Sequence, residues 1–437
     1  MKSMRLKHFK RTSVTVLFAA LCLVLGTAAT SLAAGAPQRA HPSRGSGPPD
    51  GMSWRVYHLM MAQQPLDAAA TKIQALATRP GPAHDGFFET KVDASRRILT
   101  VYWHGPVPAN VQRLISGLRA TINVRVVQTR YSLATLNRDV LVAIRSGSGV
   151  TGGYPMTDGG GIVLGVRSPD PRSVASALRS RFGVPVVATR AGVDHPQYCA
   201  WPHSNAPLGP GSRCNDWPAF WGGNVIHSDY GVFCTGGFGV HNASGGRYLI
   251  TAAHCAYNGS GLVNGIAFYN GQDPANRQLI GHITDVPGPH DLAVIPTNSG
   301  THYYDGPGIF DGDTYSTKIV AGQQATSVGD SLCESGSAGG VRCGFTVRIL
   351  NASVPDQADS QVWTGLAGAT TGIENYPRDG DSGGPWFSLD GCCTYVWAKG
   401  IHHGEFSLPG DPNVTIYAGF TPITTATSDM GVTVNRG

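Results

Sequence analysis

A serine stands inside a glycine-rich run near the end of the chain, where residues 378–385 read RDGDSGGP with the serine at position 382. Three glycines in five positions argue against a helix or strand interior and predict a tight turn. Such a turn can gather backbone N–H groups around an exposed hydroxyl, which is how acyl-transfer sites bind an oxyanion. Ser382 is therefore a candidate nucleophile that requires a base.

The base and its partner are predicted from two apolar runs. A serine hydroxyl becomes a strong nucleophile when a histidine accepts its proton and a buried carboxylate orients that histidine. His254 stands in LITAAHC, where the neighbouring cysteine can fix the loop, and Asp291 opens HDLAV, an apolar strand that would bury the carboxylate. Taken singly, these residues and Ser382 would be interpreted as a strand-end histidine, a surface cap and a turn residue.

The three runs LITAAHC, HDLAV and GDSGGP, in the order His, Asp, Ser, resemble the catalytic blocks of chymotrypsin-like serine proteases. Further stretches resemble the secreted bacterial branch, the streptogrisin and α-lytic protease group. GGNVI at 222–226 looks like the mature N-terminal stretch of that group, CESGS at 333–337 running to Cys343 looks like its hairpin disulfide, and FTP at 420–422 opens a closing segment. The resemblance covers about residues 219–437.

This resemblance implies an all-β protease domain of two packed antiparallel six-stranded β-barrels, with the site in the cleft between them. Ser382 would attack the scissile carbonyl, His254 would accept and later return the proton, and Asp291 would fix the histidine tautomer. The backbone N–H groups of Gly380 and Ser382 would form the oxyanion hole.

Substrate preference rests on the predicted pocket. Trypsin-like members place an Asp six residues before the serine to bind Arg or Lys; here Tyr376 occupies that position, so we do not expect a basic preference. The opposite wall should contain His402, His403 and Gly404. Glutamyl endopeptidases carry Gly-Ile-His in this place and bind the substrate carboxylate with the histidine, but the GDSGGP block departs from the staphylococcal enzymes. We expect a broad apolar or aromatic preference, with an acidic preference as the alternative.

The elements around these residues are predicted to be short strands. The chain has 437 residues, enough for two or three domains, and its 58 glycines with only 14% charged residues suit turn-rich β structure. Beyond Arg190 short β-rich runs alternate with turns, as expected for a closed barrel or sandwich. The runs are 237–241, 247–252, 292–296, 346–350 and 395–401.

The preceding region has a different pattern. A strand at 98–103, a helix with Val111 and Ile115 on its apolar face, and a strand at 124–127 form a βαβ-like unit, and 162–187 repeats it around a helix begun by Pro171. In the resembled group an α/β pro-region occupies this place. We expect residues 53–190 to be a pro-region that assists folding of the protease domain and inhibits it; the alternative is an independent binding domain.

The start of the chain predicts export. Basic residues in the first eleven positions precede an apolar run at 14–29 and small residues, which is typical of a signal peptide over residues 1–34. A retained membrane anchor is the competing interpretation, but the run is short for a span. We expect a Pro- and Gly-rich spacer at 35–52, a linker at 191–221 and the protease domain at 222–437, with the mature protein secreted and free of the membrane.

Cysteine pairing follows from that location. Loss of Cys22 with the signal peptide leaves eight cysteines, and an oxidising compartment favours disulfides. Proximity in sequence favours three pairs, each worth roughly 3 kcal/mol by loop entropy. These are Cys199 with Cys214, Cys234 with Cys255, and Cys333 with Cys343. The pairing of Cys392 and Cys393 stays open.

Partners and cofactors are constrained by charge and composition. The net charge of +5 is spread along the chain, so we expect no nucleic-acid partner. Histidines and cysteines do not have metal-ligand spacing, and we expect no cofactor or bound metal, with calcium in a surface loop left open. The expected partners are protein or peptide substrates and the chain's own pro-region, with the enzyme a monomer. The alternative function is a catalytically silent binding protein.

Overall fold

The computed structural model describes residues 52–77, 79, 81–147, 149–191, 195–196, 211–258, 260–270, 277–286, 288–311, 314–356, 361–371, 377–391, 394–408 and 416–437. The predicted signal peptide, the predicted spacer apart from Met52, and much of the predicted linker lie outside these residues. Within the described chain, no helix combines the length and apolar character required to cross a membrane.

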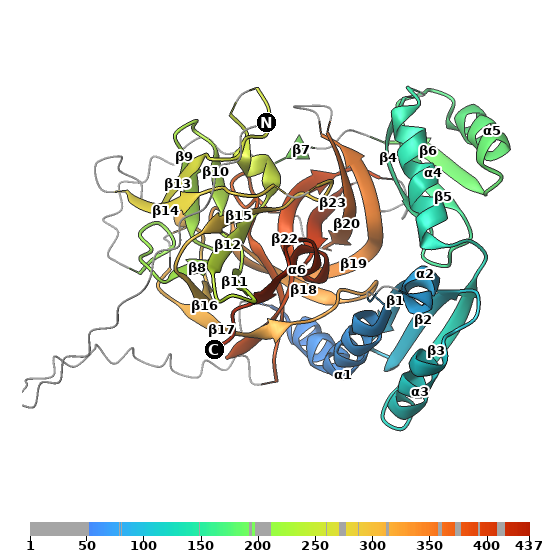
Figure 1. Ribbon diagram of the computed structural model, residues 1–437, viewed down its shortest axis with the longest axis horizontal. Helices are drawn as coiled ribbons and strands as arrows, with labels where there is room; N and C mark the ends of the chain where they lie inside the picture. The colour runs from blue at the N-terminus through green and yellow to red at the C-terminus, as the bar shows by residue number, and fades with distance from the viewer. Residues whose placement is uncertain are drawn as a thin grey trace, which may run out of the picture. The chain divides into compact units, whose positions relative to one another are not determined.

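Residues 52–191, called here the α/β region, contain helices and strands in alternation (Figure 1). The helices are α1 (Trp54–Ala77), α2 (Pro82–Gly86), α3 (Ala109–Leu118), α4 (Leu133–Arg145) and α5 (Pro171–Phe182). The strands are β1 (Phe87–Asp93), β2 (Ile98–His104), β3 (Asn123–Thr129), β4 (Val150–Pro155), β5 (Ile162–Val166) and β6 (Val186–Arg190).

Both predicted βαβ units are present. β2 and β3 pair in parallel across α3, and β5 and β6 pair in parallel across α5. The bounds of α5 follow from its sequence: the Asp170 side chain accepts a hydrogen bond from Ser173 N at 3.2 Å, Pro171 begins the first turn, and Gly183 ends the helix at φ 71°. The sequence thus predicted the α/β character of this region, while its role as a pro-region stays a prediction.

Residues 211–437, called here the β-rich region, are built from short strands, as predicted. The strands are β8 (Phe220–Gly222), β9 (Val225–Ser228), β10 (Phe233–Thr235), β11 (Gly239–Asn242), β12 (Arg247–Thr251), β13 (Ala267–Asn270), β14 (Gln278–His282), β15 (Ala293–Pro296), β16 (Ser299–Tyr304), β17 (Thr317–Gln323), β18 (Ser331–Gly336), β19 (Gly340–Pro355), β20 (Val362–Thr370), β21 (Pro385–Leu389), β22 (Tyr395–Phe406), β23 (Tyr417–Pro422) and β24 (Val432–Val434). The helices are α6 (Ile423–Met430) and the short 3₁₀ turns η2 (Ala253–Ala256) and η3 (Ile309–Asp311), and β7 (His195–Pro196) precedes this region.

The strands of the β-rich region pair in three groups. Two four-stranded sheets have the orders β10-β9-β13-β14 and β15-β12-β11-β24, and a longer path runs β19-β18-β21-β22-β17-β16-β8 with β20 and β23 beside it. Apolar side chains from all three groups of strands are fully buried in the cores of this region, including Leu249, Ile295, Phe387 and Phe420. Closure into two six-stranded barrels stays a prediction.

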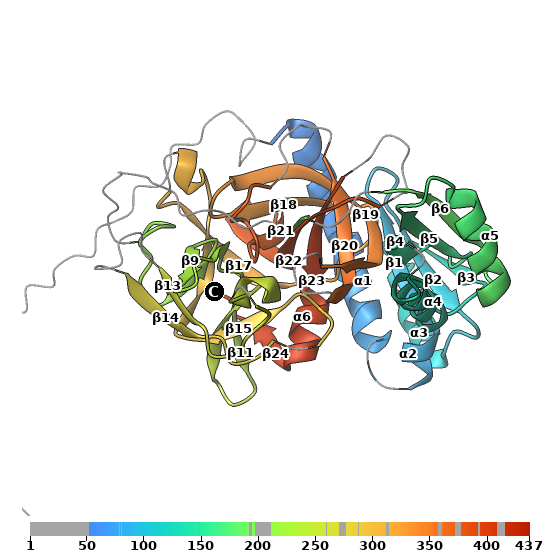
Figure 2. The same cartoon turned by 90° about the horizontal axis from the view of Figure 1, so that it is seen from above.

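The α/β region contacts the β-rich region along two elements. β4 pairs with β19 at Gly153 and Ser353, so the sheet β6-β5-β4 continues into the β-rich region (Figures 1 and 2). Helix α1 packs on β18 and β21, which pair with each other only at Cys333–Phe387 and Glu334–Trp386.

Side chains of α1 take the place of a strand partner where β18 and β21 separate. Gln63 accepts from Ser331 N at 2.7 Å through Oε1 and donates to Ser331 O at 3.1 Å through Nε2. Gln64 Nε2 donates to Leu389 O at 2.9 Å, and Leu389 N donates to the Met60 sulfur at 3.1 Å. The helix therefore supplies hydrogen-bond partners to backbone groups of β18 and β21 at positions where the two strands do not pair with each other.

Candidate active site

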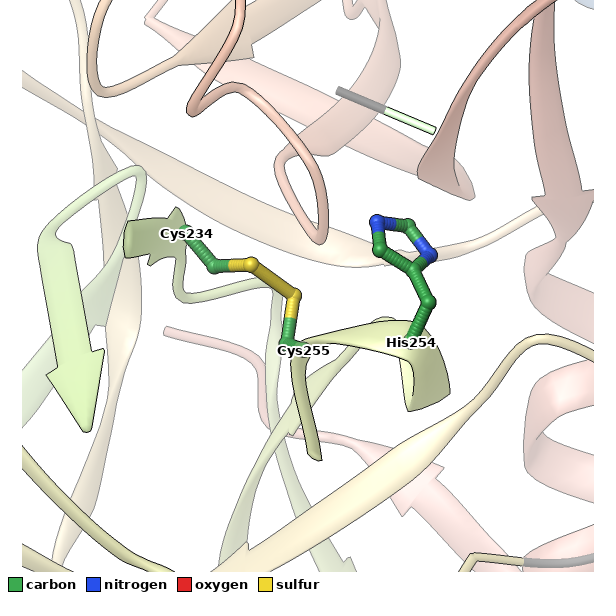
Figure 3. A group of neighbouring side chains, drawn as sticks. All are labelled: Cys234, His254 and Cys255. Atoms are coloured by element: carbon green, nitrogen blue, oxygen red, sulfur yellow. A yellow bond between two sulfur atoms is a disulfide. The ribbon is translucent and has the colours of Figure 1, made fainter. Parts of the chain in front are cut away.

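His254 lies in η2, directly after β12. Leu249 and Ile250 of β12 are fully buried. Cys255 joins η2 to β10 through its disulfide with Cys234. Figure 3 shows the imidazole leaving the same short helix as the disulfide-bonded Cys255. The buried strand before His254 and the disulfide after it thus fix the position of the histidine backbone.

Asp291 is brought to His254 by strand pairing. β12 and β15 are antiparallel with Thr251 opposite Ala293, so the end of one strand meets the start of the other. Asp291 Oδ2 lies 2.7 Å from His254 Nδ1, and Oδ1 accepts the backbone N–H of His254 at 2.9 Å. Both side chains are buried. Because an ionised carboxylate only accepts, Nδ1 carries the proton and Nε2 is the basic nitrogen of His254.

The turn that carries Ser382 is held by its neighbour. Asp381 is fully buried; its Oδ1 accepts from Ala338 N at 2.9 Å and Gly339 N at 2.8 Å, and its Oδ2 accepts from Arg378 N at 2.7 Å. The first two of these hydrogen bonds join the turn that carries Ser382 to Ala338 and Gly339, in the connection between β18 and β19.

Glycines on either side of Ser382 have positive φ angles. Gly380 is at φ 99° and Gly383 at φ 88°, and a Cβ on Gly383 would collide with Thr251 Oγ1 and the Thr235 carbonyl oxygen. Thr235 N donates to the Ser382 carbonyl at 2.7 Å. The sequence argument for a tight turn at 380–384 therefore agrees with the backbone observed.

His403 contacts both parts of this site. Its Nδ1 lies 2.6 Å from Asp291 Oδ2, the oxygen that also contacts His254, and the two imidazoles meet edge to face with centroids 5.6 Å apart. The Ser382 hydroxyl lies 3.4 Å from the His403 carbonyl oxygen. The sequence predicts His403 as part of the pocket wall, which stays a prediction, and the structure adds that its side chain reaches Asp291.

The charge state of Asp291 follows from these contacts. Burial alone would raise the pKa of Asp291, but the charge and hydrogen bond of His254 and those of His403 hold it well below its usual range. The carboxylate is therefore ionised at neutral pH, as a partner of a histidine base requires.

His402 lies on the same strand, β22, and is fully buried. Its Nδ1 accepts from Trp386 Nε1 at 3.1 Å, and its ring stacks on Trp386, which stacks in turn on Phe420. Burial, followed by His403 and His254, lowers the pKa of His402 well below its ordinary value. His402 is therefore neutral, with its proton on Nε2.

Other predicted site residues have mixed outcomes. The disulfides Cys234–Cys255 and Cys333–Cys343 form as predicted. Gly404 lies on β22, where its backbone pairs with Pro196 of β7. The predictions made for the remaining positions fall outside the described residues. These positions are Tyr376, Cys199 (and with it the pairing to Cys214), Cys392 and Cys393.

Two contacts escaped sequence reasoning. Consecutive strand residues point to opposite faces, so the His402–His403 pair could have indicated that the two rings contact different neighbours.

No pattern indicated the role of Arg213, whose fully buried guanidinium fixes the described end of the predicted linker to the β-rich region. It donates to the carbonyl oxygens of Gly223, Tyr304, Gly306 and Pro307 and to the Ser335 hydroxyl at 2.8 to 3.2 Å.

Two groups in the described chain have the residue types of a metal site. Cys234, Cys255 and His254 lie close together, but both sulfurs are in a disulfide and offer no thiolate. His254, Asp291 and His403 bring their ligand atoms to 2.6 and 2.7 Å. A tetrahedral zinc ion with ~2.0 Å bonds would separate ligand atoms by roughly 3.3 Å, so these distances fit shared protons rather than a metal.

Comparisons with known proteins give structural matches only. No protein-family profile and no curated protein matches the chain. Among solved structures, a glutamic-acid-specific serine protease described as using a histidine triad in substrate binding is 25% identical, covering 49% of this chain and 100% of its own, with a TM-score of 0.36. The chain resembles bacterial chymotrypsin-like serine proteases.

Two further structures match over the same share of the chain. The Cellulomonas bogoriensis chymotrypsin is 26% identical, with coverage of 50% of this chain and 98% of its own and a TM-score of 0.36. Thermobifida fusca protease A is also 26% identical with the same coverage and a TM-score of 0.33. Each match thus spans about half of this protease-like chain.

Proposed function

We propose that this chain is a secreted serine endopeptidase, made as a pro-enzyme, that cleaves peptide bonds through Ser382, His254 and Asp291. The observation that carries the proposal is the buried 2.7 Å contact between Asp291 Oδ2 and His254 Nδ1, next to the clamped turn of Ser382. Burial of an ionised carboxylate costs free energy of folding, and a positive charge on the neighbouring histidine offsets that cost. The arrangement is therefore typical of a histidine that becomes an imidazolium during catalysis.

The reaction would proceed by acyl transfer. His254 Nε2 accepts the Ser382 hydroxyl proton as the oxygen attacks the scissile carbonyl, and Asp291 stabilises the imidazolium that forms. The N–H groups of Gly380 and Ser382, held by the turn, bind the developing oxyanion. His254 then returns the proton to the leaving amine, and water releases the acyl group by the same steps.

We propose an apolar or aromatic preference for the residue before the scissile bond. His402 is neutral and, like Trp386 and Phe420 of its aromatic stack, fully buried, so this wall carries no fixed positive charge that would favour an acidic residue. An acidic preference remains the second candidate, because the protonated Nε2 of His402 can donate to a substrate carboxylate.

A pro-enzyme is supported by the segment that follows the α/β region. His195 and Pro196 form β7 and pair antiparallel with Glu405 and Gly404 of β22, the strand that also carries His403. Extended peptides commonly bind by adding a strand along such an edge. In addition, Ser382 is fully buried in the unprocessed chain. The α/β region would thus deliver a strand into the position of a substrate and inhibit the enzyme until processing.

We place the processing cut between residues 196 and 211. Cleavage at residue 222 would remove Arg213, whose buried hydrogen bonds hold Gly223 and Tyr304. Loss of a buried group of this kind leaves several acceptors unpaired. N-terminal sequencing of the matured protein should begin between these limits; a start beyond Arg213 would contradict the proposal.

Secreted wild type and Ser382→Ala should be incubated with a mixed peptide library and the cuts mapped by mass spectrometry. Cuts after Leu, Phe or Tyr that the alanine variant lacks are expected, and cuts after Glu or Asp would favour the acidic pocket. A catalytically silent binding protein is the competing function. It predicts a folded, processed protein that neither cleaves the library nor reacts with a covalent serine-hydrolase probe.

A further inference from the structure

One carboxylate oxygen in this molecule serves two imidazoles. Asp291 Oδ2 lies 2.7 Å from His254 Nδ1 and 2.6 Å from His403 Nδ1, and all three side chains are buried. We propose that His403 is a positioning residue that holds Asp291 through the same oxygen that His254 contacts, and that it moderates the proton affinity of His254. The inference rests on the proposed endopeptidase function.

The first step is to assign the protons. An ionised carboxylate is an acceptor only, so each imidazole must donate from Nδ1. Asp291 therefore accepts three hydrogen bonds: from His254 Nδ1, from the His254 backbone N–H and from His403 Nδ1. The two donors of His254 engage both carboxylate oxygens, and His403 adds a third donor from a different strand, β22, to Oδ2.

The second step concerns charge. Asp291 brings one negative charge to two imidazoles whose centroids are 5.6 Å apart, so they cannot both become cations without strong repulsion. His254 takes the proton during catalysis, and His403 stays a neutral donor. Its hydrogen bond stabilises the carboxylate and thereby weakens the pull of Asp291 on an additional proton at His254.

Other titratable groups border this cluster and must be kept constant in any test. His402 on β22 accepts from Trp386 through Nδ1, and His290 Nδ1 lies 3.0 Å from Asp429 of α6. Asp381 accepts backbone N–H groups beside Ser382. None of these hydrogen bonds involves the side chain of His403. After burial, however, His403 contributes most to the lowered pKa of His402, so His402 must be followed in each His403 variant.

Kinetics of the processed enzyme provide the first test. His403→Leu fills the site without a donor, and His403→Asn keeps a neutral N–H near the position of Nδ1. We expect His403→Leu to raise the acid limb of kcat/KM by about one pH unit, a tenfold change in proton affinity. His403→Asn should keep the limb of the wild type. A purely structural role predicts lower kcat in both variants without a shift, and that result would overturn the inference.

A second test needs no activity. In the full chain carrying Ser382→Ala, with ¹⁵N-labelled histidine, NMR should detect two protonated Nδ1 atoms with downfield hydrogen-bonded protons. Adding His403→Asn should remove one signal, and adding Asp291→Asn should shift both. A single such signal in the parent would refute the shared carboxylate. Two signals here, together with a processed wild-type protein that cleaves nothing, would instead refute the proposed function and leave the sharing intact.

Discussion

Strand β22 contributes to two buried clusters that are mirror images in charge. At one end His403 and His254 share the acid Asp291. Four residues earlier on the strand, Lys399 is shared by two acids: its Nζ lies 2.8 Å from Asp67 Oδ2 and 3.1 Å from Asp330 Oδ2. One cluster surrounds an acid with bases, and the other surrounds a base with acids.

The clusters differ in which parts of the chain they join. Asp291, His254 and His403 all belong to the β-rich region, whereas Asp67 comes from α1 of the α/β region. Lys399 also donates to the Ala325 carbonyl at 2.8 Å, and Gln63 of α1 donates to Asp67 Oδ2 at 3.1 Å. The proposed processing would therefore leave the first cluster complete and remove one acid from the second.

They also differ in how the charge is balanced. Burial, then the charge of Asp330, raises the pKa of Asp67 to about 8 against the opposing charge of Lys399. At neutral pH the Lys399 cluster thus holds one extra proton and is electrically neutral. The Asp291 cluster keeps one uncompensated negative charge, which would stabilise the proton that His254 accepts in the proposed reaction. A neutral cluster suits docking, and a charged one suits proton transfer.

The largest expected effect separates the two clusters by activity. Asp291→Asn places an amide donor against two imidazole donors and should lower kcat by about 10⁴-fold, because His254 loses its tautomer. The matched control is Asp330→Asn, which neutralises an acid of the other cluster and should leave kcat of the processed enzyme within a few-fold of wild type. Equal losses in the two variants would mean that the clusters do not have separate roles.

A smaller effect is expected for stability. Lys399→Met leaves Asp67 and Asp330 buried without a cation, and breaking a buried ion pair in this way costs about 3–5 kcal/mol of unfolding free energy. Urea unfolding of the full chain in the Ser382→Ala background measures the loss without self-cleavage. The acid limb of kcat/KM in the processed Lys399→Met enzyme should not move. A shift there would show that the two clusters are coupled along β22.

The smallest effect is a pH dependence. Because the pKa of Asp67 is raised in the folded chain, its contribution to stability is full below its ordinary value near 4 and is lost as pH rises towards about 8. The slope from this one proton is at most about 1.4 kcal/mol per pH unit. Asp67→Asn imitates the protonated acid and should flatten unfolding free energy against pH between 5 and 8. An unchanged slope would place the extra proton elsewhere.

The two regions also show what sequence could predict. Strong periodicity placed β2 and β5 within one residue of their observed bounds and the start of α5 at Pro171. Helix α1 escaped, because Gln63 and Asp67 interrupt its apolar face with polar residues that are fully buried. The partner of Asp67, Lys399, is 332 residues away in the sequence, and no local pattern encodes this pairing.

The same limit applies within the site. Three motifs predict His254, Asp291 and Ser382 as base, acid and nucleophile, because these roles need distinct local surroundings that leave a trace in sequence; the roles themselves stay predictions. The contact between His403 and Asp291 joins residues 112 positions apart and depends on how β22 lies beside β12 and β15. Sequence predicted that His403 stands near the nucleophile, and only the arrangement of strands assigns the atom it contacts.

The contacts of α1 with β18 and β21 would allow the proposed release of the α/β region to be followed directly. The amide hydrogens of Ser331 and Leu389 are bonded to Gln63 and Met60 of α1 rather than to a strand. In deuterated water these two amides should exchange slowly in the unprocessed chain and rapidly once α1 has left. Hydrogen exchange at two positions would therefore time the release of the helix without any substrate.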